Sequence, residues 1–229
     1  MKGFVISDLH LFTDRSSTQE IAVSMHNQLG RADFLVLNGD IFDFEWTHLS
    51  SVEQTMDEAE QWLGHLARQY PDCVFYYILG NHDAFEPFVQ RVNKMTKKLP
   101  NLHLCPTHLV LGKNLFFHGD LPLAQKNPWQ RSPARHLSKK KSLWHLGYDW
   151  AVKCRLHTMV YSLFSPAYCA KRIVSVLQEY PKNFLAEIEH IYFGHTHFPF
   201  ADFSHGQFSF SNAGAAINGV NANMIKVNI

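Results

Sequence analysis

The sequence has few cysteines and no long apolar run, and both absences restrict what the protein can be. Its four cysteines are widely spaced and form no Cys-x-x-Cys pair. This argues against a disulfide framework or a thiolate zinc site and predicts reduced thiols in a cytosolic enzyme. No apolar run reaches the roughly 18 residues of a membrane span. The first apolar run starts at about Gly3, which leaves no room for a signal peptide, so a cytoplasmic location is expected.

The chain also lacks repeats, low-complexity segments and a strong overall charge. Its 229 residues carry a formal net charge of +1 and are long enough to bury a substantial core, so one domain over residues 1–229 is predicted. The charge is unevenly distributed. Residues 121–188 contain eleven Lys or Arg against three acids, a net charge of +8, which leaves about −7 on the rest. Such asymmetry usually marks an anionic partner.

What the chain does contain is five short groups of Asp, His and Asn in a fixed order. They are Asp8-Leu9-His10, Gly39-Asp40-Ile41-Phe42-Asp43, Gly80-Asn81-His82-Asp83, His118-Gly119-Asp120 and Gly194-His195-Thr196-His197. Each follows an apolar run that predicts a buried strand: Gly3–Ser7, Phe34–Asn38, Val74–Leu79, Leu115–Phe117 and Ile191–Phe193. Because open α/β sheets bind ligands beyond the carboxyl ends of their strands, the five groups are expected to converge.

The donor atoms in these groups indicate a metal centre. Oxygen and nitrogen donors without thiolate suit Mn, Fe, Zn, Co or Ni. Two such ions about 3.5 to 4 Å apart can bind two oxygens of a phosphate, lower the pKa of a shared water and neutralise charge during in-line displacement. Phosphoester hydrolysis is therefore the natural interpretation. Asp43, Asp83 and Asp120 have an equal alternative as helix caps or turn residues.

The ordered motifs resemble the pattern DxH, GDxxD, GNH(D/E), H, GHxH of calcineurin-like binuclear metallophosphoesterases. The resemblance implies a four-layer α/β/β/α sandwich with two divalent metal ions at the strand ends, manganese first among the candidates. It implies the following ligands: Asp8, His10 and His197 for the first metal, Asp40 as the bridge, and Asn81, His118 and His195 for the second metal.

The same resemblance makes His82 a catalytic residue that holds no metal. It would donate a hydrogen bond to the phosphate or protonate the leaving oxygen. Asp83 would be available to orient the ring of His82, and Asp43 is expected to lie behind the ligands rather than among them.

Between the motifs, the sequence alternates helix and strand. A helix is predicted over Ser51–Tyr70, because Ser51 and Gln54 form a capping box and Pro71 follows its end. A second helix is predicted from about Phe85 to Lys98. The segments Phe208–Asn212 and Asn223–Ile229 are predicted to be strands.

Residues 121–188 are predicted to form a basic, helical insertion beside the active site. Leu156, Met159, Val160, Leu163 and Phe164 share one helical face, Ser165-Pro166 interrupts it, and a further helix is expected over Ala167–Tyr180. Aromatic residues are interleaved with the basic ones, which favours a substrate with both phosphate and apolar or ring parts. The candidate substrate-binding residues are Arg131, Arg135, Lys139, Lys140 and Lys141. Peripheral contact with the inner face of a membrane is expected through the same segment.

The insertion is similar in place to that of the UDP-2,3-diacylglucosamine hydrolases, which cleave the pyrophosphate of a nucleotide-linked lipid. The chain departs from that group at His82, where Gly-Asn-Arg-Asp is common, and at Leu121-Pro122-Leu123, where a polar stretch is usual. A phosphodiesterase or nuclease acting on nucleotides or nucleic acid is the alternative. A non-catalytic scaffold that binds anionic lipid or a partner protein is the alternative of another class. The basic segment also has a plainer interpretation, as a solvated loop over core aromatics.

Overall fold

Two five-stranded sheets form the centre of the protein. The computed structural model describes the whole chain except residues 125, 138–163, 180–184, 218–219 and 221. The elements along the chain are β1 (Lys2–Ile6), α1 (Gln19–Leu29), β2 (Phe34–Asn38), α2 (Val52–Gln69), β3 (Val74–Ile78), α3 (Glu86–Thr96), β4 (Leu102–Cys105), β5 (His108–Leu111), β6 (Asn114–Phe117), α4 (Asp120–Leu123), α7 (Pro166–Leu177), β7 (His190–Phe193), β8 (Phe200–His205), β9 (Phe208–Asn212) and β10 (Ile225–Asn228).

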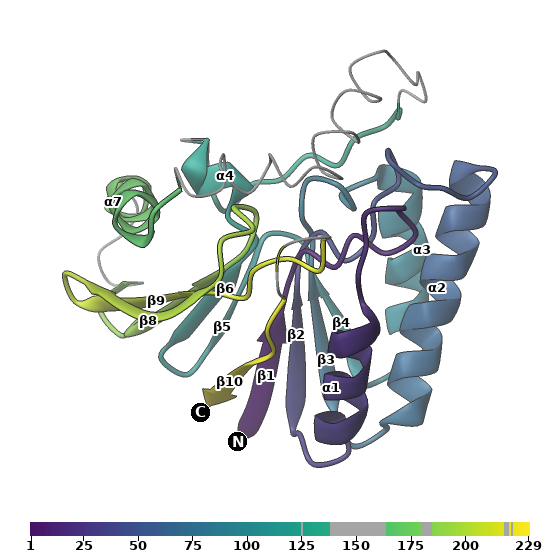
Figure 1. Ribbon diagram of the computed structural model, residues 1–229, viewed down its shortest axis with the longest axis horizontal. Helices are drawn as coiled ribbons and strands as arrows, with labels where there is room; N and C mark the ends of the chain where they lie inside the picture. Colours follow the sequence, from purple (N-terminus) through teal and green to yellow (C-terminus); the bar gives the residue numbers. More distant parts are fainter. Residues whose placement is uncertain (125, 138–163, 180–184, 218–219, 221) are drawn as a thin grey trace.

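The first sheet has the strand order β10-β1-β2-β3-β4, and the second has the order β5-β6-β7-β9-β8. Strands β1 to β4 are parallel to one another, as are β6, β7 and β9 in the second sheet. The antiparallel strands β10, β5 and β8 lie at sheet edges. Helices α1, α2 and α3 cover the outer face of the first sheet, and α7 lies against the second (Figure 1).

Alternating residues of each strand fill three apolar layers. Phe4 and Leu35 pack toward helices α1 to α3, whereas their neighbours Val5 and Val36 pack between the sheets. On the second sheet, Phe117 faces α7 in a third cluster. This burial on both faces explains why the central strands are apolar throughout, and it confirms the predicted four-layer α/β/β/α sandwich.

The capped helices begin close to where the sequence places them. The hydroxyl of Ser51 accepts a hydrogen bond from the backbone N–H of Gln54 at 2.9 Å and starts α2. Ser165, expected to interrupt a helix, caps α7 in the same way, with Pro166 in its first turn. Helix α7 ends at Leu177, three residues before the predicted Tyr180.

The predicted insertion is described only in part. Residues 126–137 and α7 are placed. Lys139, Lys140, Lys141 and the predicted helical face of Leu156, Met159, Val160 and Leu163 lie outside the described residues. Among the described helices, none combines the length and apolarity needed to cross a membrane. Among the described residues, Cys73, Cys105 and Cys169 form no disulfide, and Cys154 lies outside them.

Candidate metal centre

The predicted ligands lie in loops that leave the carboxyl ends of β1, β2, β3, β6 and β7. Several of them have a left-handed backbone, which non-glycine residues rarely adopt: Asp8 (φ 52°), His10 (φ 44°), Asp40 (φ 51°), His195 (φ 67°) and His197 (φ 58°). Each such residue costs on the order of 1 to 3 kcal/mol, and such residues cluster at functional sites. Asp and His adopt this conformation more readily than most other non-glycine residues, and the bends bring these side chains together.

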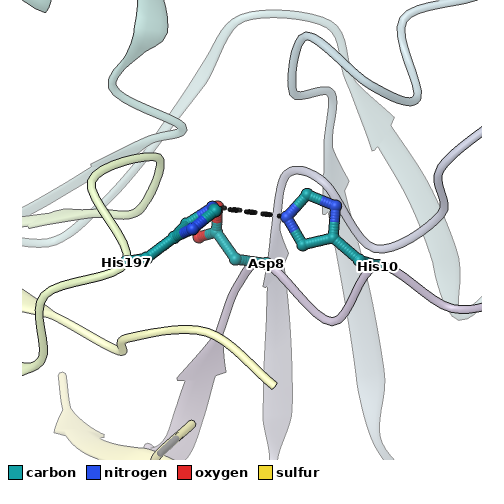
Figure 2. A group of neighbouring side chains, drawn as sticks. All are labelled: Asp8, His10 and His197. Atoms are coloured by element: carbon teal, nitrogen blue, oxygen red, sulfur yellow. Dashed lines mark hydrogen bonds and ion pairs between the residues drawn. The ribbon is translucent and has the colours of Figure 1, made fainter. Parts of the chain in front are cut away.

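The first group of donors consists of Asp8, His10 and His197, which face one another (Figure 2). The Nε2 atoms of His10 and His197 are 3.3 Å apart, and Nε2 of His197 is 3.2 Å from Oδ1 of Asp8. Two ring nitrogens and a carboxylate oxygen thus lie around one point. Asp8 and His10 come from the first sheet and His197 from the second.

The second group consists of Asp40, His118 and His195. Nδ1 of His118 donates to the backbone carbonyl of Asn38 at 3.1 Å, which leaves Nε2 as the ligand atom. That Nε2 is 3.1 Å from Oδ2 of Asp40, yet it makes no aligned hydrogen bond. A separation of this size suits two ligands of one cation.

The spacing of these donors fits divalent transition metals. A metal with bonds of 2.0 to 2.2 Å to its nitrogen and oxygen ligands keeps neighbouring donors about 2.8 to 3.6 Å apart, from octahedral to tetrahedral angles. The distances of 3.3 Å and 3.2 Å in the first group and 3.1 Å in the second fall in this range. Asp40 also belongs to a further donor group with His10 and His82. Its carboxylate therefore lies within reach of a donor from the first group as well as those of the second.

Glycines in three of the motifs allow the loops to approach so closely. A Cβ on Gly80 would lie 2.0 Å from Oδ1 of Asp40, and a Cβ on Gly194 would lie 2.2 Å from Oδ2 of Asp8. Gly39, with φ 84°, would bring a Cβ to 2.4 Å from Nδ1 of His118. Each glycine therefore leaves room for a predicted ligand that another motif supplies.

In the protein without metal, the buried carboxylates and imidazoles of the site shift one another's pKa values. Burial works to raise the pKa of Asp40, but His118 and His82 hold it well below its usual value. Burial works to lower the pKa of His118, but Asp40 and Asp8 raise it to about 10. Burial and the neighbouring His118 lower the pKa of His195 to about 4. Without metal, the cluster therefore places a protonated imidazole, His118, next to its carboxylates. A metal ion can replace this positive charge, and its binding then releases the proton.

Comparison with known proteins identifies the family to which the chain belongs. The sequence pattern of the family described as calcineurin-like phosphoesterase matches residues 1–199. The chain belongs to this family. A solved structure of a dimetal phosphatase from Danio rerio is 11% identical in sequence. The match covers 95% of this chain and 88% of the chain of that phosphatase, with a TM-score of 0.48. A second solved structure is also 11% identical, with coverages of 93% and 90% and a TM-score of 0.45. No curated protein matches the chain.

In this phosphoesterase, the ring of His82 is held by Asp43. Nδ1 of His82 lies 3.1 Å from Oδ2 of Asp43. Burial works to lower the pKa of His82, but the carboxylates of Asp43 and Asp40 raise it to about 9. Asp83, expected to orient this ring, instead accepts hydrogen bonds from Gly80 N, Ile41 N and the hydroxyl of Tyr77. Its carboxylate fixes the loop between β3 and α3. Asn81 lies exposed in that loop.

Three polar residues outside the predicted ligand set support the site. Asn38 donates to the carbonyls of Phe117 and Tyr192 and so joins the two sheets beneath His118. Asn212 donates to Gly194 O and to the hydroxyl of Thr196, and it thereby braces the loop that carries two predicted ligands. The signal for Asn38 was an amide that ends an otherwise apolar strand. The third residue, Arg15, contacts Asp43 at 3.1 Å.

Two of the predicted substrate-binding residues are described, and their environments differ. Arg131 forms a paired contact with the carboxylate of Asp120, at 2.9 and 2.6 Å, and its side chain is only 6% exposed. The side chain of Arg135 is 82% exposed and lies 3.3 Å from Glu86. Arg131 therefore already has an anionic partner within the protein, and the side chain of that partner is only 12% exposed. Arg135 presents its charge to solvent.

Proposed function

We propose that this phosphoesterase hydrolyses its substrate with two bound divalent transition-metal ions. The proposed ligands are Asp8, His10 and His197 for one ion, Asn81, His118 and His195 for the other, and Asp40 between them. The observation that supports this most directly is the pair of donor groups with spacings near 3 Å. Manganese is the first candidate for both ions.

Two ions bound there would act as Lewis acids toward the phosphoryl oxygens and lower the pKa of a bound water. The chain's own contribution begins with Asp40, whose Oδ1 accepts the backbone N–H of His82 at 2.8 Å while Oδ2 lies beside His118. Because both of its oxygens have a partner, the carboxylate of Asp40 keeps a fixed orientation toward the two donor groups. Asp8 is fixed similarly, because both of its oxygens accept the backbone N–H of His195 at 3.1 Å.

His82 is the proposed proton donor to the leaving oxygen. Asp43 engages Nδ1 of His82, so Nε2 is the ring nitrogen left for the substrate. The ring centroid of His82 lies 5.1 Å from that of His10, which places it beside the donor cluster. His82 is half-buried and therefore accessible to a substrate at the mouth of the site.

The finer proposal is that the substrate is the pyrophosphate of a nucleotide-linked glycolipid, similar to UDP-2,3-diacylglucosamine. It is supported by the basic insertion between the fourth and fifth motifs and by the exposed cation of Arg135. Binding through this segment would include contact with the inner face of a membrane. The phosphodiesterase or nuclease alternative predicts instead that nucleotides or nucleic acid are the better substrates.

The test is turnover of a chromogenic phosphodiester with and without added Mn²⁺, followed by a panel that includes a nucleotide-linked glycolipid and single-stranded DNA. We expect metal-dependent turnover and two ions per chain by elemental analysis. Asp40→Ala should abolish both. No turnover of any phosphoester in metal-loaded protein would favour the scaffold interpretation, and at most one ion per chain would exclude the two-metal site.

His82→Ala separates catalysis from metal binding. Loss of a proton donor should lower turnover by about 100-fold or more, while two ions remain bound. Because His82 also belongs to a donor group with His10 and Asp40, the variant could instead lose an ion. That result would make His82 a ligand and remove it as the proton donor.

A further inference from the structure

Arg15 lies in the loop between β1 and α1 and reaches the back of the candidate site. The residue is only 8% exposed. One of its terminal nitrogens donates to Oδ2 of Asp43 at 3.1 Å, and its guanidinium carbon lies 4.4 Å from the centroid of the Trp46 ring. The contact with the ring is a cation–π interaction, which favours a flat guanidinium over a compact ammonium. The charge of Arg15 is therefore held in one place from two sides.

The partner of Arg15 is shared with two functional histidines. Oδ2 of Asp43 also lies 3.4 Å from Nδ1 of His10 and 3.1 Å from Nδ1 of His82. Thus one oxygen faces a predicted metal ligand, the proposed proton donor and Arg15. The other oxygen, Oδ1, accepts the backbone N–H groups of Glu45 and Trp46 at 3.1 and 3.0 Å.

The two sets of contacts hold different parts of the carboxylate. The terminal torsion of an aspartate is broad, so anchoring Oδ1 alone leaves the direction of Oδ2 loosely defined. The described contacts of Oδ2 are with His10, His82 and Arg15, so Arg15 is the described partner that is not one of the two histidines. The guanidinium thus fixes the atom from which both rings take their orientation.

We propose that Arg15 is a positioning residue for the proposed hydrolysis: through Oδ2 of Asp43 it sets the rings of His82 and His10. The inference rests on the proposed function. Direct binding of a substrate phosphate by Arg15 fits the structure less well, because its side chain is only 10% exposed and lies against Trp46 and Asp43.

The experiment compares Arg15→Met and Arg15→Lys with Arg91→Met in the full-length, manganese-loaded protein. Arg91 is the matched control, because it also pairs with carboxylates, Glu53 and Asp57, but on helices α2 and α3 away from the site. On a small phosphodiester, Arg15→Met should lower kcat by about 10- to 100-fold with KM within about twofold, and weaken Mn²⁺ binding by about 10-fold. Arg15→Lys should recover part of kcat, and millimolar methylguanidinium should raise kcat of Arg15→Met only.

Two outcomes would overturn the proposal. If KM rises and kcat is unchanged, Arg15 contacts the substrate; if Arg15→Met behaves like Arg91→Met, it has no role in the site. Should Arg15→Met fail to fold, Trp46→Leu provides the second variant, since it removes the ring contact and keeps the charge, and a smaller fall in kcat at constant KM is expected. If the unmodified protein shows no turnover, the proposed function fails, and the Mn²⁺ affinity of the Arg15 variants still decides whether Arg15 positions His10.

Discussion

Individual glycines decide how closely the predicted ligands can approach one another. Gly80 is the tightest case, because a methyl group there would lie 2.0 Å from Oδ1 of Asp40 and 2.4 Å from its backbone nitrogen. Neither atom can move far, since Asp40 is buried and its carboxylate is already bound by the backbone of His82. A single methyl group is therefore enough to displace the proposed bridging carboxylate.

We expect Gly80→Ala to weaken Mn²⁺ binding by at least about 10-fold, comparable to the loss of a group that orients a metal ligand. Isothermal titration with Mn²⁺ would measure this, and circular dichroism would establish that the variant folds. Gly30→Ala is the control, because a Cβ there would meet nothing within 4 Å. A folded Gly80→Ala protein with unchanged affinity would show that Asp40 is not held by this contact.

The sequence predicted which residues converge at the site, but not how their rings are oriented. Asp8, Asp40 and His118 could be predicted to lie at the site, because each follows a buried strand and the ends of these strands meet at one edge of the sandwich. The partner of His82 was expected to be its neighbour Asp83 and is instead Asp43, 39 positions away in the chain. Such a pairing depends on the path of a loop after β2, and no local pattern in the sequence encodes that path.

At the scale of elements, the segment Asn127–Arg135 connects loops on both sides of the site. After α4 the chain passes over the strand ends toward α3 (Figure 1). Trp129 packs edge-on against His108 of β5, with ring centroids 4.3 Å apart. Ala134 exchanges backbone hydrogen bonds with the loop after β3, accepting from Glu86 N at 2.9 Å and donating to Ala84 O at 2.8 Å. Between these contacts lies the pair of Arg131 with Asp120.

Removing Arg131 should therefore destabilise the protein rather than weaken substrate binding alone. Arg131→Ala leaves the carboxylate of Asp120, which is only 12% exposed, without its partner, and this should cost about 2 kcal/mol in the free energy of unfolding, between the values for exposed and buried pairs. Urea denaturation would measure it. Arg135→Ala removes an exposed ion pair and should cost less than about 1 kcal/mol. Equal, small losses in both variants would mean that the pair does not hold this segment in place.

Elements with capping residues or apolar runs were predictable, and those that depend on tertiary contacts were not. Ser51 and Ser165 mark the starts of α2 and α7. Helix α1 gave no such signal, because its cap, Thr18, makes no side-chain hydrogen bond and only Ile21, Met25 and Leu29 are buried. Strand β8 was also missed. It pairs at a sheet edge with a register shift between Phe200 and Phe203, which disrupts the alternation of apolar and polar residues.

At the scale of the whole molecule, both donor groups draw on both sheets. Asp8 and His10 from the first sheet meet His197 from the second, and Asp40 meets His118 and His195. The sheets are otherwise joined mainly by an apolar layer, with Asn38 bridging them near the site. Bound metal ions would thus cross-link the two halves of the sandwich at the end where the backbone is strained.

Metal removal should therefore lower the unfolding temperature of the entire protein in one transition. A single ion at 100 times its dissociation constant stabilises the folded state by about 2.7 kcal/mol, and each kcal/mol corresponds to roughly 2 to 4 °C in a chain of this size. We expect calorimetry to show a Tm about 5 to 10 °C lower after chelation for each ion lost. Asp40→Ala, which lacks the shared carboxylate, should show little change on chelation. A metal-dependent shift of the same size in that variant would place the stabilising ions elsewhere, and a second transition would mean that the sheets unfold separately.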